Sequence, residues 1–261
     1  MTSATHELVR TAYGRGVAIL TLDSPANRNA LSSALMTQLL TALAAAEAEP
    51  EIRVVVLSHT GPVFCSGADL AETAAARTAG ELPVRMLGRV LVALAECPKP
   101  VVAQVGGPAR AGGLGLIAAA DIAVCAQEAT FAFSEVRLGV IPAVISATVL
   151  PRLHPRAAAE LYLTGEVFDG RRAEQVGLVT AAVPAATLDE AVGSYCAALV
   201  RGGPNALAGT KALLRRQPET TLRDEVEALS ALSADYFGSD EGREGVASFR
   251  EKREPRWVPR A

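Results

Sequence analysis

The chain has 261 residues, of which 50% are hydrophobic and 20% are charged, a balance that allows one large buried core. Its formal charge of −3 argues against the basic surface that nucleic-acid binding requires. The longest apolar stretch, residues 111–126, is too short and too broken to span a bilayer, and residues 1–10 lack the apolar segment of a signal peptide. We therefore expect a cytoplasmic protein without a nucleic-acid or membrane partner.

The four cysteines, Cys65, Cys97, Cys125 and Cys196, are widely spaced and form no C-x-x-C pair. We expect them to be reduced thiols, most of them buried. Only three histidines are present, and none has the spacing of metal ligands. No metal site is therefore expected.

Short apolar segments rich in β-branched residues alternate with Ala- and Leu-rich helical segments through the first two-thirds of the chain. A turn at residues 13–16 before an apolar run predicts a hairpin. Ser32 or Ser33 can cap a helix, and further helices are predicted around 86–94 and 112–120. Predicted strands cover 17–22, 54–57, 101–105, 122–125, 130–133 and 178–183. This alternation favours an α/β core with a parallel sheet.

From about Ser146 onward the pattern is mostly helical, with amphipathic helices over 206–214 and 222–236. Their apolar faces need a partner, either the core or another subunit. We therefore divide the chain into a core over residues 1–200 and a helical region over 201–261, which we expect to cover part of the core and to form oligomers. The Ala-rich segment 71–80 is predicted to be a mobile loop.

A glycine-rich turn over residues 106–115 follows one predicted strand and opens a helix. Glycines let the backbone approach a ligand closely, and free N–H groups at a helix start suit an anion or a developing oxyanion. By itself this turn fits close helix–strand packing equally well. A second turn, residues 64–70, also follows a strand and places a small residue at a predicted helix start. Two such turns could aim two N–H groups at one carbonyl oxygen.

The segment 131–139 places Glu135 directly after an apolar strand. A carboxyl group in apolar surroundings has a raised pKa and can exchange protons. A single glutamate is usually a solvated surface residue. Here the apolar flanks and the two glycine-containing turns favour a catalytic role.

In this order, three segments resemble the crotonase (enoyl-CoA hydratase/isomerase) family: FCSGADL, KPVVAQVGGPARAGGLGLIAAADIAV and FAFSEVRLGVIPAVIS. Further similar segments are SPANRNALS, LTGEVFDGRRAEQVGLVTAAVP and the ending SFREKREPRW. The resemblance covers nearly the whole chain and implies an α/β spiral of ββα units with a C-terminal helical region. It also implies a homotrimer or a dimer of trimers, an acyl-CoA substrate, and no cofactor, because the substrate itself carries the CoA.

The resemblance also implies roles for individual residues. The backbone N–H groups of Ala68 and Gly112 would hold the thioester oxygen and stabilise an enolate, with Glu135 as the acid/base. Arg28 would meet a CoA phosphate, and Lys252 matches C-terminal basic residues that reach CoA, sometimes from a neighbouring subunit. The implied CoA-binding positions are Arg28, Ala30, Ser66, Ala68, Asp69 and Leu70.

One position departs from the hydratase pattern. Family hydratases carry a second glutamate where this chain has Gly115, so Glu135 is left as the only candidate for proton transfer. We first expect an enoyl-CoA hydratase of a single-glutamate subgroup, similar to methylglutaconyl-CoA hydratases. An enoyl-CoA isomerase with Glu135 as its proton shuttle and a non-catalytic acyl-CoA binder remain open. Dehalogenase chemistry is disfavoured because no aspartate lies between Gly139 and Leu163.

Arg110 stands two residues before Gly112, where the family usually has an apolar residue. It could pair with Glu135, with Glu72 or with a carboxylate on the substrate. It could equally be an exposed loop arginine. We place Arg110 and Gly115 in the expected substrate pocket.

Overall fold

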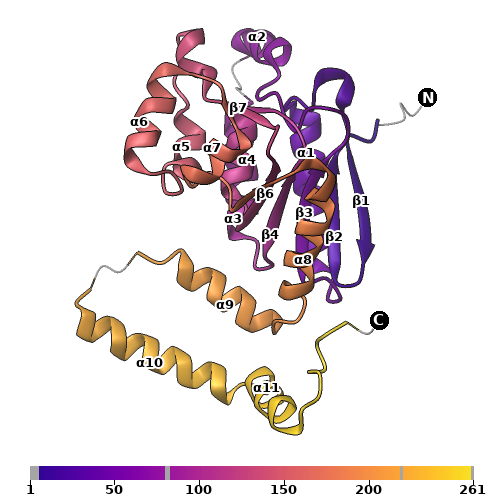
Figure 1. Ribbon diagram of the computed structural model, residues 1–261, viewed down its shortest axis with the longest axis vertical. Coiled ribbons are helices and arrows are strands. Elements are labelled where there is room, and N and C mark those ends of the chain that lie inside the picture. The colour runs from indigo at the N-terminus through magenta and orange to yellow at the C-terminus, as the bar shows by residue number, and fades with distance from the viewer. Residues whose placement is uncertain (1–5, 80–82, 218–219, 260–261) are drawn as a thin grey trace.

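The computed structural model describes residues 6–79, 83–217 and 220–259 (Figure 1). Its centre is a six-stranded sheet in the order β1-β2-β3-β4-β6-β9. The first two strands form the predicted antiparallel hairpin, and all later pairs in this sheet are parallel. The strands are β1 (Val9–Gly14), β2 (Val17–Leu22), β3 (Val54–His59), β4 (Val101–Val105), β6 (Ile122–Ala126) and β9 (Ala181–Val183).

Alternate residues of the central strands face two different hydrophobic clusters, as the pleat of a strand requires. On β3, Val55 and Leu57 belong to the larger core, whereas Val54 and Val56 face the opposite side. That opposite side is covered by α8 (Leu188–Leu199), which lies in front of the sheet in Figure 1. The larger core lies between the sheet and three helices, α1 (Ser33–Ala48), α3 (Val84–Glu96) and α4 (Gly112–Ala119).

A second, three-stranded sheet has the order β5-β7-β8. β5 follows closely after β4 and pairs in parallel with β7, which pairs with β8 in the antiparallel direction. Its strands are β5 (Ala109–Arg110), β7 (Thr130–Ala132) and β8 (Phe168–Asp169). This small sheet carries the two chain segments that contain Gly112 and Glu135.

The rest of the chain is mostly helical, as predicted. Three helices stand beside the core: α5 (Ala143–Val149), α6 (Pro155–Thr164) and α7 (Gly170–Gln175). Three more extend away from it in Figure 1: α9 (Pro204–Leu214), α10 (Leu222–Gly238) and α11 (Asp240–Glu251). Across the described ranges, no helix combines the length and the apolar character that crossing a membrane requires.

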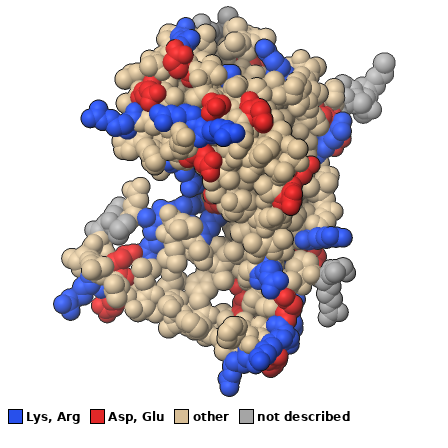
Figure 2. Space-filling view, in the orientation of Figure 1, with Lys and Arg blue, Asp and Glu red and all other residues tan. Residues whose placement is uncertain are grey.

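A buried ion pair attaches the C-terminal helices to the core. Lys211 of α9 lies 2.6 Å from Asp121, just before β6. Its ammonium group also donates to the carbonyl oxygens of Leu94 and Lys99. Basic side chains gather where the core meets these helices (Figure 2). Arg215, directly after α9, pairs with Glu96 at the end of α3.

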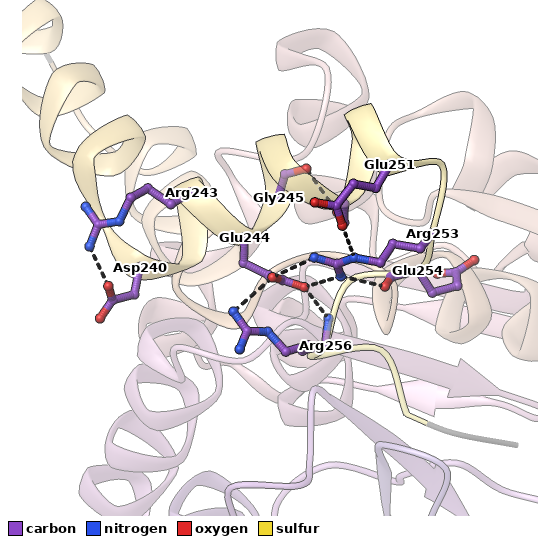
Figure 3. A network of polar contacts seen from close by, with 9 residues as sticks. Asp240, Arg243, Glu244, Gly245, Glu251, Arg253, Glu254 and Arg256 are labelled. Carbon is purple, nitrogen blue, oxygen red and sulfur yellow. Dashed lines mark hydrogen bonds and ion pairs between the residues drawn. The ribbon is translucent and has the colours of Figure 1, made fainter.

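The end of the chain folds back on α11 (Figure 3). The carboxylate of Glu244 accepts two hydrogen bonds from Arg253, at 2.6 and 3.0 Å. It also accepts one from the backbone N–H of Arg256 at 2.9 Å and pairs with the guanidinium of that residue. These contacts hold the turn at Lys252, which closes the helix in the left-handed conformation with φ 55°.

Two sequence-based expectations for elements were wrong. The segment predicted as a mobile loop, 71–80, belongs to helix α2 (Leu70–Ala79), and only its last residue, Gly80, lies outside the described residues. Asp69 initiates this helix by accepting hydrogen bonds from the N–H groups of Ala71 and Glu72, and the alanines that follow favour helix. The last strand is also shorter than the predicted 178–183, because β9 begins only at residue 181.

The four cysteines are buried and unpaired, as predicted. Burial raises the pKa of Cys65 and of Cys125 to about 12, so these thiols stay protonated and unreactive at neutral pH. Within the described residues, no three His, Cys, Asp or Glu side chains gather as a metal site would require.

Candidate active site

Three chain segments run side by side in the same direction at the second sheet. Cys65 pairs with Ala109, and Ala109 pairs with Phe131, all in parallel register. Three residues further along, the same register places Ala68 beside Gly112. The parallel pairing therefore brings together the two turns that the sequence singled out, with the segment of Glu135 on their other side.

Gly67 allows the two turns to touch. Its φ is +92°, and a Cβ on it would lie 3.0 Å from the Cβ of Ala111 and 3.1 Å from the carbonyl oxygen of Arg110. Ala111 itself has φ 46° and ψ −115°, a conformation ordinarily left to glycine. Both residues directly precede the candidate oxyanion donors, so the backbone at the site is tightly constrained.

The N–H groups of Ala68 and Gly112 donate to no acceptor in the described part of the chain. Gly112 is the first residue of α4, where the N–H has no intrahelical partner and the helix dipole adds positive potential. Two adjacent free donors are the arrangement that stabilises a developing oxyanion.

Both residues line a cavity of about 280 Å³ together with Glu135. Its remaining wall is largely apolar and includes Leu31, Met36, Leu87, Val140, Ile141, Val144 and Ile145. A larger hollow of about 850 Å³ lies over the outer face of the sheet beside α8, and its one acidic lining residue, Asp189, already accepts a hydrogen bond from Gln104. The smaller cavity is therefore the candidate active site.

Glu135 follows β7 in a short 3₁₀ helix, Ser134–Leu138. Only 9% of the residue is exposed, and its Oε2 has no hydrogen-bond partner among the described residues. Burial raises the pKa of this carboxyl above its ordinary value. A hydrogen bond from the backbone N–H of Glu135 itself lowers the pKa by a smaller amount. A buried carboxyl of this kind is suited to accept and return a proton.

An aromatic wall supports the segment that carries Glu135. The ring of Phe133 lies 4.4 Å from that of Tyr162 on α6, and the Tyr162 hydroxyl is 3.5 Å from Ser146 Oγ. Burial, with a smaller contribution from the charge of Glu135, raises the pKa of Tyr162. Sequence reasoning did not single out Tyr162, because nothing in its helical segment marks proximity to the carboxylate.

The sequence model of the family described as "Enoyl-CoA hydratase/isomerase" matches residues 12–260. The chain belongs to this family.

Relatives agree with the assignment over nearly the full length. The peroxisomal Delta(3,5)-Delta(2,4)-dienoyl-CoA isomerase of Arabidopsis thaliana is 30% identical over 269 residues, which covers 97% of each chain. The enoyl-CoA hydratase structure from Mycobacterium smegmatis superposes with a TM-score of 0.89 at 32% identity, covering 97% of this chain and 99% of that one. The structure of Pseudomonas aeruginosa AtuE superposes with a TM-score of 0.90 at 35% identity, covering 97% of this chain and 100% of that one. The expected crotonase fold is confirmed.

The positions expected from this family to bind CoA lie together. The loop over residues 24–31 runs beside residues 66–70, joined by a 3.0 Å hydrogen bond from the N–H of Ser66 to the carbonyl of Arg28. A second hydrogen bond links the N–H of Leu31 to the carbonyl of Gly67. Arg28 is exposed, Ala30 is buried below it, and Leu70 is 66% exposed. Asp69 is engaged as the cap of α2.

Asn29 organises this loop, and sequence reasoning missed it. The side chain is fully buried; its Oδ1 accepts from the N–H of Ser24 at 2.7 Å. Its Nδ2 donates to the carbonyls of Thr60 and Val63 at 3.0 and 2.8 Å. The available signal was a segment that contains Ser24, Pro25 and Asn27 just before it, a turn-forming context in which asparagine often adopts positive φ, here 52°.

Arg110 pairs with neither of the two protein carboxylates considered for it, Glu135 and Glu72. Its guanidinium donates to the carbonyl of Thr130 at 2.6 Å, to the Thr130 hydroxyl at 3.1 Å and to its own neighbour, Ala109. It is half-buried and is not among the residues that line the cavity. Its guanidinium therefore ties β5 to β7 and bonds to neither Glu135 nor Glu72.

Gly115 also does not line the cavity. A Cβ on it would lie 2.6 Å from Cγ2 of Ile145 and 3.3 Å from Cδ2 of Leu91. Ile145, on α5, is the residue that lines the cavity at this point. The place in which family hydratases carry a second glutamate is thus filled by an aliphatic side chain.

Proposed function

We propose that this protein is an enoyl-CoA hydratase that adds water reversibly to a 2-enoyl-CoA thioester. The observation that carries the proposal is the pair of free N–H groups, on Ala68 and Gly112, in one apolar cavity with the buried carboxylate of Glu135. The hydratase name of the Mycobacterium smegmatis relative supports it.

In the proposed reaction, the thioester oxygen accepts hydrogen bonds from the N–H groups of Ala68 and Gly112. Glu135 takes a proton from water as the oxygen of that water bonds to C3, and negative charge moves onto the thioester oxygen. The same carboxyl then returns the proton to C2, so atoms and charge balance. Each N–H donor contributes about 3–4 kcal/mol to stabilising the enolate.

The CoA moiety is proposed to lie along the loop 24–31 and residues 66–70. Arg28 is exposed there and is suited to a CoA phosphate. Ala30, Ser66, Ala68, Asp69 and Leu70 complete the proposed CoA-binding surface. Because the substrate carries CoA itself, the reaction needs no further cofactor.

An enoyl-CoA isomerase is the second candidate, and the position of Ile145 over Gly115 favours it. Because Ile145 fills the space over Gly115, Glu135 is left as the one carboxylate for proton transfer. One carboxylate is sufficient to move a proton between two carbons of a 3-enoyl thioester. The dienoyl-CoA isomerase name of the Arabidopsis thaliana relative fits this chemistry.

A panel of acyl-CoA esters separates these functions. A hydratase removes the absorbance of the conjugated thioester in crotonyl-CoA or methylglutaconyl-CoA, whereas an isomerase creates it from a 3-enoyl-CoA. We expect Glu135→Gln to lower either rate at least about 100-fold, since general acid–base catalysis contributes that much. Normal rates in this variant would refute the role of Glu135. CoA esters that raise Tm without turnover would instead indicate a binding protein.

We further propose that residues 201–261 cover the active site and join protomers into a homotrimer or a dimer of trimers in the cytoplasm. No residue of α10 is buried within the chain, and large apolar side chains on α10 and α11 face outward, among them Leu222, Val226, Phe237 and Phe249. Four unpaired cysteines suit a reducing compartment. Light scattering at defined protein concentrations measures the oligomer.

A further inference from the structure

Ile145 on α5 lies over Gly115 of α4 and forms part of the wall of the cavity. A Cβ at Gly115 would lie 2.6 Å from Cγ2 and 3.1 Å from Cβ of Ile145, well inside the separation of non-bonded carbons. Ile145 is 3% exposed and lines the same cavity as Glu135. It therefore occupies the space into which any side chain at position 115 would project.

Packing of α5 against α4 holds Ile145 in this place. The hydroxyl of Thr148 lies 3.2 Å from the carbonyl of Gly115 and 3.1 Å from that of Ile145. Val149, one turn further along the same helix, is fully buried in the core. Ile145 is thus a fixed part of the wall.

An aliphatic wall has a chemical consequence. A water molecule stays in a cavity only where two to four polar groups hold it. The unpartnered Oε2 of Glu135 supplies one such group, and Ile145 supplies none. A proton shift needs no water: Glu135 takes a proton from C2 of a 3-enoyl thioester, the electron pair moves to the thioester oxygen, and the proton returns to C4.

We propose that Ile145 is the specificity-determining residue of this site. By barring a second water-binding group beside the acyl chain, it sets the ratio of water addition to 1,3-proton shift. This inference rests on the enolate chemistry of the proposed function.

The test compares Ile145→Thr with Ile145→Val, which match in shape and differ in a hydroxyl for a methyl. Hydration of crotonyl-CoA and isomerisation of 3-hexenoyl-CoA are measured on each variant and on the wild type. We expect the ratio of hydration to isomerisation to be about tenfold higher in Ile145→Thr than in Ile145→Val, the effect of one added hydrogen bond to the attacking water.

Val149→Thr controls for a new hydroxyl on α5, because Val149 is buried and does not line the cavity. Its ratio should equal that of the wild type. Equal ratios in Ile145→Thr and Ile145→Val would overturn the inference while leaving the proposed function intact. A wild type inactive on both substrates would overturn both.

The occupation of the space is tested separately by unfolding. Gly115→Ala should lower Tm in the wild-type background and lower it less when combined with Ile145→Ala, because the smaller residue frees the space. Strictly additive changes in Tm would show that Ile145 does not fill the space over Gly115. The inference would then fail even if hydration and isomerisation were both detected.

Discussion

Among single residues, Asn29 shows how a buried polar side chain positions a binding loop. Two of its three hydrogen bonds join the loop 24–31 to the chain after β3, and the third links Asn29 to Ser24 within the loop. An alanine would leave the N–H of Ser24 and the carbonyls of Thr60 and Val63 without their partner. Each unsatisfied buried group costs about 1–3 kcal/mol.

We therefore expect Asn29→Ala to lower the free energy of unfolding by at least about 2 kcal/mol. Where the variant stays folded, KM for acyl-CoA should rise more than kcat falls, because the proposed role of the loop is to bind CoA and not to transfer protons. Denaturant titration and steady-state kinetics measure the two effects. Asn27→Ala, two residues earlier in the same loop and exposed, is the matched control. A fall in kcat with an unchanged KM would contradict this role.

A second prediction for a single residue concerns Glu135, because burial favours the protonated form of its carboxyl group. The folded-state pKa is raised, so the unfolded chain loses its proton first as the pH rises above 4.5. Ionised Glu135 therefore costs stability at neutral pH. We expect Glu135→Gln to be more stable than the wild type at pH 7 and equally stable below the ordinary glutamate pKa. Thermal melts from pH 4 to 8 measure the difference in stability between the variant and the wild type. A stability gain of the variant that grows toward low pH would contradict the prediction.

The pH dependence of activity has the same origin. A carboxylate base is lost when it takes up a proton, so the acidic limb of the kcat/KM profile should lie above the ordinary pKa of glutamate.

At the scale of an element, α2 corrects a conclusion drawn from composition. The alanine-rich segment was predicted to be mobile, but Asp69 caps it and the carboxylate of Glu72 accepts from the backbone N–H of Ser33 at 2.8 Å. The second contact joins α2 to the start of α1. A partner far along the chain, invisible to local patterning, thus orders the helix beside the site.

The C-terminal turn of α11 depends on Glu244. Its pKa is lowered to about 2, first by the hydrogen bonds from Arg253 and then by those from Arg256. Because the folded-state pKa lies below the ordinary 4.5, the stabilisation is present above pH 4.5 and is lost as the pH falls toward 2.

We expect Glu244→Gln to loosen the segment 252–259 at neutral pH, measured as faster amide exchange there. Wild type and variant should converge as the pH falls from 4.5 toward 2. Asp240→Asn, whose pair with Arg243 is exposed, is the control and should change little. An equal effect of both substitutions would contradict the role of Glu244.

For the whole molecule, Lys211 decides how the C-terminal helices sit on the core. Its ammonium group is buried between α9 and the start of β6, where it meets Asp121 at 2.6 Å. Removing one partner of a buried ion pair is far more costly than removing an exposed one.

Lys211→Met should lower the free energy of unfolding by about 3 kcal/mol and speed proteolysis within α9–α11. Arg215→Ala removes a more exposed contact to the same part of the core and should cost less than about 1 kcal/mol. Denaturant unfolding and limited proteolysis provide the measurements. A Lys211→Met protein as resistant as the wild type would show that other contacts hold the helices.

Local residue order was enough to predict the order of the elements and the segments that carry the candidate site. Hydrophobic periodicity and turn residues act over a few positions, so the hairpin, the strand 101–105 and the helix capped by Ser32 were predicted closely. Glu135 and the two glycine turns were recognised in the same way, from local residue order.

Which distant residues meet depends on how the whole chain packs. Ile145 over Gly115, Thr130 against Arg110, and Asn29 against Thr60 are contacts between segments far apart in the chain. Such contacts depend on how helices and sheets pack, and packing leaves no periodic signal in either segment. The carboxylate was therefore predictable from sequence, but the aliphatic wall beside it was not.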